Sequence, residues 1–278
     1  MGFFVMVLLS LLLLMPGQPA LKSIFVKSGP NPFVVGRSEG QQRAIVLIHG
    51  LGLHPLARDK VTQAIPRSWQ QPTSPLVLSL SKLADVYIFA YSQTVPVEKV
   101  AEESALSRSI ERLKKDGYTQ IILIGHSAGG LIARQLIEDH PQCGATKIIQ
   151  VNAPNGGSTW ATIGLTREEQ TAFFKSLSVP ARERLLSFRK EKTLPQEVEF
   201  GCVVGSLRLG TDGIVSCRSQ WTEDLQRQGI PAFLLPGGHR DAVATPKGVE
   251  LLTRLVRDPL PRWDQDKVAA FRRGLIGK

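Results

Sequence analysis

The sequence predicts an α/β fold with a mostly parallel central sheet flanked by helices, and three observations carry the prediction. Short, largely apolar segments with the length of buried strands recur at residues 44–48, 86–90, 120–124 and 147–151. Helical periodicity alternates with them at 97–115 and 131–139. The chain of 278 residues is 42% hydrophobic and 21% charged, which suits one large folded domain. Since strands separated by helices pair in parallel, the alternation indicates a single parallel sheet.

The second half of the chain continues the alternation, apart from one interruption. The later elements are two strands and a final helix, expected at 199–204, 232–235 and 246–256. Between residues 155 and 197 the strand pattern stops, and two helices are expected instead, near 167–177 and 181–190. We predict that this insertion is a helical cap or lid over the carboxyl edge of the sheet, where functional loops gather. The main domain is then expected to span residues 21–257.

The first twenty residues, 1–20, resemble a secretory signal peptide. An apolar run at 3–15 is interrupted only by Ser10, is short for a bilayer span, and is followed by the small residue Ala20. No basic residue precedes the run, and Gln18 is larger than the residue preferred before a cleavage site. An uncleaved membrane anchor is therefore the alternative. We expect an extracytoplasmic protein, secreted or periplasmic, or one anchored to the membrane by this segment.

The net charge of +10 narrows the expected partners. It results from 34 basic against 24 acidic side chains, and such an excess attracts anionic surfaces. The sequence has no zinc-finger spacing, no RNP-like motif and no dense basic block, so we expect no nucleic-acid partner. Loose association with a membrane surface remains compatible with the charge. The basic tail at 258–278 is expected either to lie on an anionic membrane or to pack back on the domain.

Three cysteines are too few for a disulfide framework. Cys202 and Cys217 bracket Asp212, so a bond between them would fasten the loop that carries this aspartate. Two buried, reduced thiols are the equally weighted alternative. Cys143 would stay unpaired in either case.

Ser127 is the candidate nucleophile. It stands in Gly125-His126-Ser127-Ala128-Gly129, after the strand at 120–124 and before the helix at 131–139, which is the context of a nucleophile elbow. Such a strained turn holds the serine oxygen out of the sheet, and glycines leave room for the neighbouring backbone. The alternative is a glycine-rich turn whose serine only caps the following helix.

A serine hydroxyl needs a base, and the base needs an acceptor that fixes its tautomer. We assign the base to His239, because it follows the last predicted strand and precedes the last helix. The other histidines have less suitable positions, namely His49, His54, His126 and His140. We assign the acid to Asp212, which gives the chain order Ser, Asp, His. Asp241 is the alternative acid, although it is expected to start the final helix, and Asp212 could instead belong to a plain Asp-Gly turn.

The remaining candidate residues concern the oxyanion and the acyl group. The backbone N–H groups of Ala128 and Leu51 are the expected oxyanion donors, unless Leu51 belongs to a plain turn. Phe173, Phe174 and Phe188 of the insertion could line an acyl pocket and bind substrate. The alternative is that these aromatic residues only pack the insertion onto the domain.

These motifs together resemble the α/β-hydrolase superfamily, and within it the bacterial lipase and esterase branch. The likeness spans residues 43–257. Its motifs are Ile48-His49-Gly50-Leu51-Gly52, Gly125-His126-Ser127-Ala128-Gly129-Gly130, Asn152-Ala153-Pro154-Asn155-Gly156-Gly157-Ser158 and Thr211-Asp212-Gly213-Ile214-Val215. The resemblance implies an α/β-hydrolase fold and an acyl-enzyme mechanism without a cofactor. The second acidic pair that binds structural calcium in some relatives is not evident, so we expect no metal.

The sequence therefore predicts a serine hydrolase that cleaves carboxylic esters, either small-molecule or lipid esters. The same triad chemistry would serve an acyltransferase, a thioesterase or an amidase. A catalytically silent binding module on the same fold is the alternative from a different class, because a fold does not guarantee a function.

Overall fold

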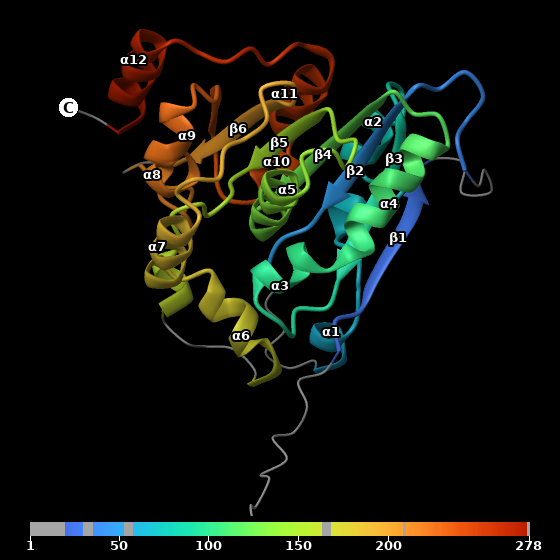
Figure 1. The fold of residues 1–278 in the computed structure, drawn as a ribbon, viewed down its shortest axis with the longest axis horizontal. Helices are drawn as coiled ribbons and strands as arrows, with labels where there is room; N and C mark the ends of the chain where they lie inside the picture. The colour runs from blue at the N-terminus through green and yellow to red at the C-terminus, as the bar shows by residue number, and fades with distance from the viewer. Residues whose placement is uncertain (1–19, 30–35, 53–57, 163–167, 208–209, 277–278) are drawn as a thin grey trace, which may run out of the picture.

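The computed structural model describes residues 20–29, 36–52, 58–162, 168–207 and 210–276. Its centre is a seven-stranded sheet with the order β1-β3-β2-β4-β5-β6-β7. Only β1 runs antiparallel to its neighbour, and all other pairs are parallel, so the predicted mostly parallel sheet is confirmed (Figure 1). The strands are β1 (Ser23–Ser28), β2 (Arg43–Ile48), β3 (Asp85–Tyr91), β4 (Gln120–His126), β5 (Lys147–Val151), β6 (Glu199–Ser206) and β7 (Ala232–Pro236).

The sheet has a hydrophobic cluster on each face. Along β2, Val46 and Ile48 belong to one cluster and Ile45 and Leu47 to the other, because side chains alternate along a strand. The first cluster packs under α3 (Val97–Glu102), α4 (Ser104–Lys115), α5 (Ala128–Asp139) and α12 (Gln265–Ile276). The second packs under α2 (Pro75–Leu80), α10 (Asp241–Ala244) and α11 (Pro246–Arg257). Burial on both faces explains why the central strands are largely apolar in the sequence.

Strand β1 was not predicted, because its pattern differs from that of the central strands. Its exposure alternates along the chain, with Ile24 and Val26 on the outer side, as at the edge of a sheet. Lys27 forms an ion pair at 3.0 Å with Asp85 of β3. This contact lies at the beginning of β3, the opposite end of that strand from the catalytic loops.

The helices agree with the predicted alternation in position, with one correction. The predicted helix at 97–115 is two helices, α3 (Val97–Glu102) and α4 (Ser104–Lys115), because Glu103 adopts an extended conformation between them. The other helices are α1 (Arg58–Thr62), α2 (Pro75–Leu80), α5 (Ala128–Asp139), α8 (Cys217–Gln220), α9 (Glu223–Arg227), α10 (Asp241–Ala244), α11 (Pro246–Arg257) and α12 (Gln265–Ile276), with short 3-10 turns at Ser68–Gln70 and Thr159–Thr162.

The insertion between β5 and β6 contains helices α6 (Glu168–Ser176) and α7 (Val179–Phe188). Figure 1 shows both, in yellow, on the side of the sheet to which the arrowhead of β6 points. Ion pairs hold α7 and its end to the domain. Arg182 contacts Glu98 at 3.1 Å, and Arg189 contacts Glu138 at 2.8 Å.

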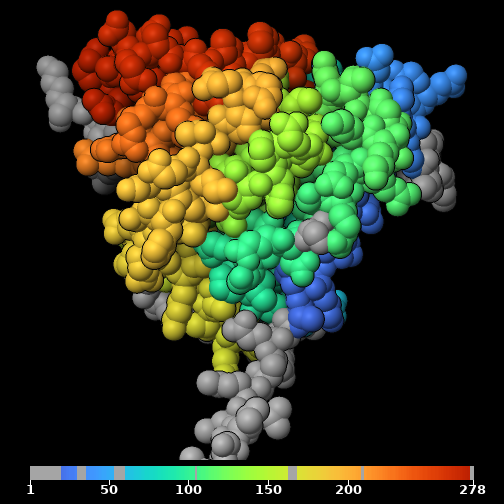
Figure 2. Space-filling model, in the orientation of Figure 1, coloured from blue at the N-terminus to red at the C-terminus, as the bar shows by residue number. Residues whose placement is uncertain are grey.

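The carboxyl-terminal tail packs back on the domain as helix α12. Its Val268 and Leu275 are buried, and the ring of Phe271 lies 5.4 Å from that of Trp221. Figure 2 shows the tail, in red, lying against the orange segment of the chain. Of the two alternatives for the tail, the structure has the packed one.

All three cysteines are buried and free, so Cys202 and Cys217 are not joined to each other. Burial raises the pKa of the Cys202 thiol, which keeps it protonated.

The expected signal peptide or anchor lies outside the described residues, except for Ala20. Of the helices in the described ranges, none is long and apolar enough to cross a bilayer.

Candidate active site

Ser127 lies in a tight turn between β4 and α5. Its backbone has φ 55° and ψ −126°, a conformation that residues other than glycine rarely adopt. A Cβ atom on Gly125 would collide with the backbone of Gly129, and one on Gly129 would collide with Ile48 O. The glycines of the motif are therefore required by the close packing of this turn, as the sequence predicts for a nucleophile elbow.

The hydroxyl of Ser127 is not used to cap the helix. Ser127 is the N-cap residue of α5, yet its side chain makes no capping hydrogen bond. Its backbone N–H donates instead to Val151 O at 2.8 Å. The residue is 6% exposed, so the oxygen is largely shielded from solvent. The capping alternative is thus not observed.

Asp212 and His239 form a close pair. Nδ1 of His239 lies 2.7 Å from Oδ2 of Asp212, and the His239 N–H donates to Asp212 O at 2.9 Å. Three further groups donate to the buried carboxylate: Ile214 N at 2.9 Å, Val215 N at 2.7 Å and Gln220 Nε2 at 3.2 Å. The carboxylate is held on both oxygens, and it fixes the proton of His239 on Nδ1. The other ring nitrogen, Nε2, then has its lone pair available.

Asp241 has a different role. It is the first residue of α10, and its Oδ2 accepts a hydrogen bond from Gly238 N at 2.6 Å. A Cβ atom on Gly237 would lie only 2.7 Å from the same oxygen. Asp241 therefore shapes the loop before His239, whereas Asp212 contacts the imidazole.

The main chain of His239 is bonded to the last residue of β4 and to the residue that follows β5. Its carbonyl oxygen accepts hydrogen bonds from His126 Nε2 at 2.8 Å and from Asn152 Nδ2 at 2.9 Å. Burial lowers the pKa of His126 to about 3, so the ring is neutral near pH 7. Asn152 has φ 52°, and Gly205 N donates to its Oδ1 at 3.1 Å. Neither His126 nor Asn152 has a predicted role from the sequence, although Asn152 begins the motif Asn152-Ala153-Pro154-Asn155-Gly156-Gly157-Ser158.

The loop after β2 lies against Ser127. A Cβ atom on Gly50 would collide with that of Ser127, so the two backbones are in close contact. His49 is buried, stacks on Tyr91 with ring centroids 4.3 Å apart, and receives the Tyr91 hydroxyl on its carbonyl oxygen at 2.7 Å. Leu51, which follows Gly50, packs against the core. Ala128 is the first residue of α5, and its N–H has no carbonyl within the helix to bind.

The structure does not bring the three phenylalanines of the insertion together. Phe173 is fully buried, with its ring 5.9 Å from that of Tyr91, and Phe174 is 7% exposed. Phe188, at the end of α7, is 86% exposed. In this conformation Phe173 presents no surface to solvent and packs against Tyr91. That the three side chains line an acyl pocket stays a prediction.

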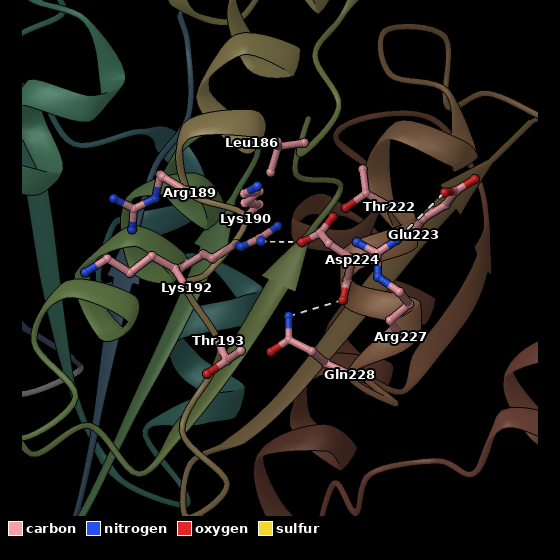
Figure 3. A pocket seen from close by; sticks show the side chains of 11 residues that line it. Leu186, Arg189, Lys190, Lys192, Thr193, Thr222, Glu223, Asp224, Arg227 and Gln228 are labelled. Atoms are coloured by element: carbon pink, nitrogen blue, oxygen red, sulfur yellow. Dashed lines mark hydrogen bonds and ion pairs between the residues drawn. The ribbon is translucent and has the colours of Figure 1, made fainter.

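A polar cavity of about 360 Å³ lies elsewhere, between the end of α7 and α9 (Figure 3). None of Ser127, Asp212 and His239 lines it. Its basic side chains have acidic neighbours. Arg134, for example, is bonded to Asp224 and also to Glu138. The lining is a network of ion pairs that joins the insertion to the domain. Within the described ranges, no group of three or more His, Cys, Asp or Glu side chains is arranged to hold a metal ion.

The parallel sheet, the serine in the elbow and the Asp212–His239 pair define the class of the protein as an α/β-hydrolase. Residues 45–276 match the model of the Alpha/beta hydrolase family. The match covers most of the sequence, and the chain belongs to this family.

Solved structures with the same fold include lipases. The mature lipase BlEst2 from Bacillus licheniformis has a TM-score of 0.53 at 11% identity, with 84% of this chain and 96% of that chain covered. Phospholipase PlaB from Legionella pneumophila has a TM-score of 0.57 at 16% identity, with 84% and 62% covered. A lipase-esterase related protein from Clostridium acetobutylicum has a TM-score of 0.51 at 11% identity, with 84% and 98% covered. At these identities the likeness establishes the fold. Comparison with curated proteins gives no significant match.

Proposed function

We propose that the protein is a carboxylic ester hydrolase in which Ser127, His239 and Asp212 form a catalytic triad. The observation that carries the proposal is the 2.7 Å contact between Asp212 Oδ2 and His239 Nδ1. The loop of this pair is bonded to His126, the residue before the elbow serine. A serine in a strained turn, with the residue before it bonded to the loop of an oriented imidazole, suits acyl transfer.

In the first half of the reaction, Ser127 Oγ attacks the acyl carbon while His239 Nε2 takes the hydroxyl proton. Asp212 stabilises the resulting imidazolium through Nδ1. The negative oxygen of the tetrahedral intermediate accepts hydrogen bonds from the backbone N–H groups of Leu51 and Ala128. When the intermediate collapses, the bond to the alcohol oxygen breaks, and His239 returns its proton to the leaving alkoxide. The products are an alcohol and an acyl ester of Ser127.

The second half repeats these steps with water. His239 removes a proton from a water molecule, whose oxygen attacks the acyl carbon of the ester on Ser127. The same two N–H groups stabilise the second tetrahedral intermediate. Its collapse breaks the bond to Ser127 Oγ, which recovers its proton from His239. The acid leaves and the enzyme is restored.

Small-molecule or lipid esters are the proposed substrates. The similar structures are a lipase, a phospholipase and a lipase-esterase related protein, and their names support an ester substrate for this chain. Whether residues 155–197 contribute to binding of the acyl chain stays a prediction. An acyltransferase, a thioesterase or an amidase would use the same residues, and a chromogenic series of oxygen esters, thioesters and amides distinguishes these reactions.

The decisive experiment is labelling with a fluorophosphonate probe, followed by mass spectrometry of the labelled peptide. The proposal predicts one phosphonylated residue, Ser127, and loss of label in the Ser127→Ala variant. Turnover of short chromogenic esters should be blocked in proportion to labelling. A folded protein that neither labels nor hydrolyses any ester of the series would instead be a binding module.

A further inference from the structure

The two peptide groups that meet at Gly52, in the loop after β2, are each bonded to a glutamine. The N–H of Gly52 donates to Gln93 Oε1 at 2.9 Å, and the Gly52 carbonyl accepts from Gln170 Nε2 at 2.8 Å. Gln170 Nε2 also donates to Gln93 Oε1 at 2.9 Å, so the three groups close a ring of hydrogen bonds. Gln93 follows β3 in the main domain, whereas Gln170 lies in α6 of the insertion. Two distant segments therefore fix the backbone on either side of the Gly52 Cα atom.

The ring is shielded from water. Gln93 and Gln170 are each 1% exposed. Hydrogen bonds in such surroundings are strong, and a buried amide that lost its partner would be costly to leave unpaired. Arg67 lies close to Gly52, because a Cβ atom on Gly52 would lie 2.5 Å from its guanidinium group. The hydrogen bonds to Gln93 and Gln170 fix the two peptide groups that Gly52 joins.

The residues after β2 are held at both ends by the end of β3. Tyr91 stacks on His49 and bonds to its carbonyl oxygen, and Gln93 binds the N–H of Gly52. Leu51, whose N–H is the proposed oxyanion donor, lies between these two fixed points. Its peptide plane can rotate only if one of them moves. Gln170 is the contribution of the insertion to this arrangement.

Helix α6 is itself fixed to the domain. Val97 N, at the start of α3, donates to Ser176 Oγ at the end of α6 at 3.1 Å. In the following helix, Arg182 pairs with Glu98 at 3.1 Å, and its own side chain is 5% exposed. Gln170 therefore approaches the loop from a helix with a defined place.

From these contacts we infer that Gln170 and Gln93 are positioning residues for the oxyanion hole, and that α6 is part of the catalytic apparatus as well as a cover. The inference rests on the proposed function. The insertion acts on the chemistry through the chain Gln170, Gln93, Gly52 and Leu51 N–H. Removal of one oxyanion donor lowers kcat by about 10² to 10³-fold in serine hydrolases, so misplacement of one should lower it by roughly 10 to 10²-fold.

Gln170→Glu is the direct test, because it changes the donor amide to oxygen without a change of shape. The new oxygen would face two acceptors, Gly52 O and Gln93 Oε1, and the ring would open. We expect kcat/KM on a short ester to fall by roughly 10 to 10²-fold. The Ki of a trifluoromethyl ketone, whose hemiketal mimics the oxyanion, should rise by the same factor, because both measure stabilisation of that charge. Gln170→Met, which removes the donor without adding charge, should have the same effect if Gln170→Glu fails to fold.

A matched control separates this role from general stability. Gln226 of α9 is 5% exposed and donates from Nε2 to Trp221 O at 2.8 Å, away from the loop after β2. Gln226→Glu should lower the melting temperature but leave both kcat/KM and Ki within about twofold of the wild type.

The outcomes of these measurements distinguish the inference about Gln170 from the proposed function. An active wild type with Gln170 variants whose Ki stays unchanged would overturn the inference and leave the proposed function intact. Loss of turnover in these variants without a matching rise of Ki would also overturn it. A wild type that neither turns over esters nor reacts with the fluorophosphonate would overturn both.

Discussion

The carbonyl oxygen of His239 accepts a hydrogen bond at 2.8 Å from Nε2 of His126, the residue directly before Ser127. The loop that carries the proposed base is therefore bonded to the strand that carries the proposed nucleophile. Asn152, which follows β5, donates to the same carbonyl oxygen at 2.9 Å. Because these bonds reach the main chain of His239, they define the position of the imidazole independently of its contact with Asp212.

Replacement of Ser127 by alanine should abolish turnover and leave the fold intact. The attacking oxygen is lost, and loss of a triad serine lowers kcat by roughly four to six orders of magnitude. Ester hydrolysis and circular dichroism of the purified variant measure the two effects. Substantial hydrolysis by a folded Ser127→Ala protein would show that another residue is the nucleophile.

The Asn variants of the two candidate acids, Asp212 and Asp241, should differ in activity. Asp212→Asn places an amide against Nδ1 and favours the wrong tautomer of His239, which lowers kcat by about 10⁴-fold in a related triad. Asp241→Asn keeps an oxygen that can accept from Gly238 N, so we expect less than about tenfold loss. Steady-state kinetics of both variants decide between them, and a greater loss for Asp241→Asn would mean that the acid is misassigned.

Much of this arrangement was predictable because it depends on local signals. The elbow requires glycines at Gly125 and Gly129, and these mark Ser127 in the sequence. His239 and Asp212 each follow a predicted strand, and parallel strands bring such loops to one edge of the sheet. The alternation of apolar strands and helices likewise predicted the sheet.

The rest depends on contacts between distant segments. Gln93 and Gln170 are 77 residues apart, and nothing in either neighbourhood indicates that both bind Gly52. The burial of Phe173 against Tyr91 could not be distinguished from an exposed pocket wall, because an aromatic residue suits both. Glu103 interrupts a helix without a proline or glycine, so its extended backbone has no sequence signal that we recognise.

His126 should contribute to a loss of stability in acid. Burial lowers its folded pKa to about 3, below the ordinary value of 6.5, so the unfolded chain binds a proton that the folded chain excludes. This destabilisation is absent above pH 6.5 and grows as the pH falls toward 3. Each pH unit in this range corresponds to roughly 1 to 1.5 kcal/mol for one proton.

Urea unfolding between pH 6 and pH 4 measures this effect. We expect the free energy of unfolding of His126→Gln to fall less steeply with decreasing pH than that of the wild type, by about 1 kcal/mol per pH unit. The slope is the relevant quantity, because the substitution also alters a hydrogen bond to His239. His140→Gln, at an exposed position, controls for the loss of one imidazole. Parallel slopes for the wild type and His126→Gln would contradict the prediction.

The phenylalanines of the insertion distinguish packing from substrate binding. Phe173 is fully buried, so Phe173→Ala should lower the free energy of unfolding by about 3 to 5 kcal/mol. Phe188 is 86% exposed, and Phe188→Ala should change it by less than about 0.5 kcal/mol. If Phe173 only packs, its loss reduces kcat/KM for short and long acyl esters by the same factor. A chain-length series on both variants, measured below their melting temperatures, provides the comparison. A selective loss on long-chain esters in Phe173→Ala would mean that α6 moves to expose this ring and that the insertion forms the acyl wall after all.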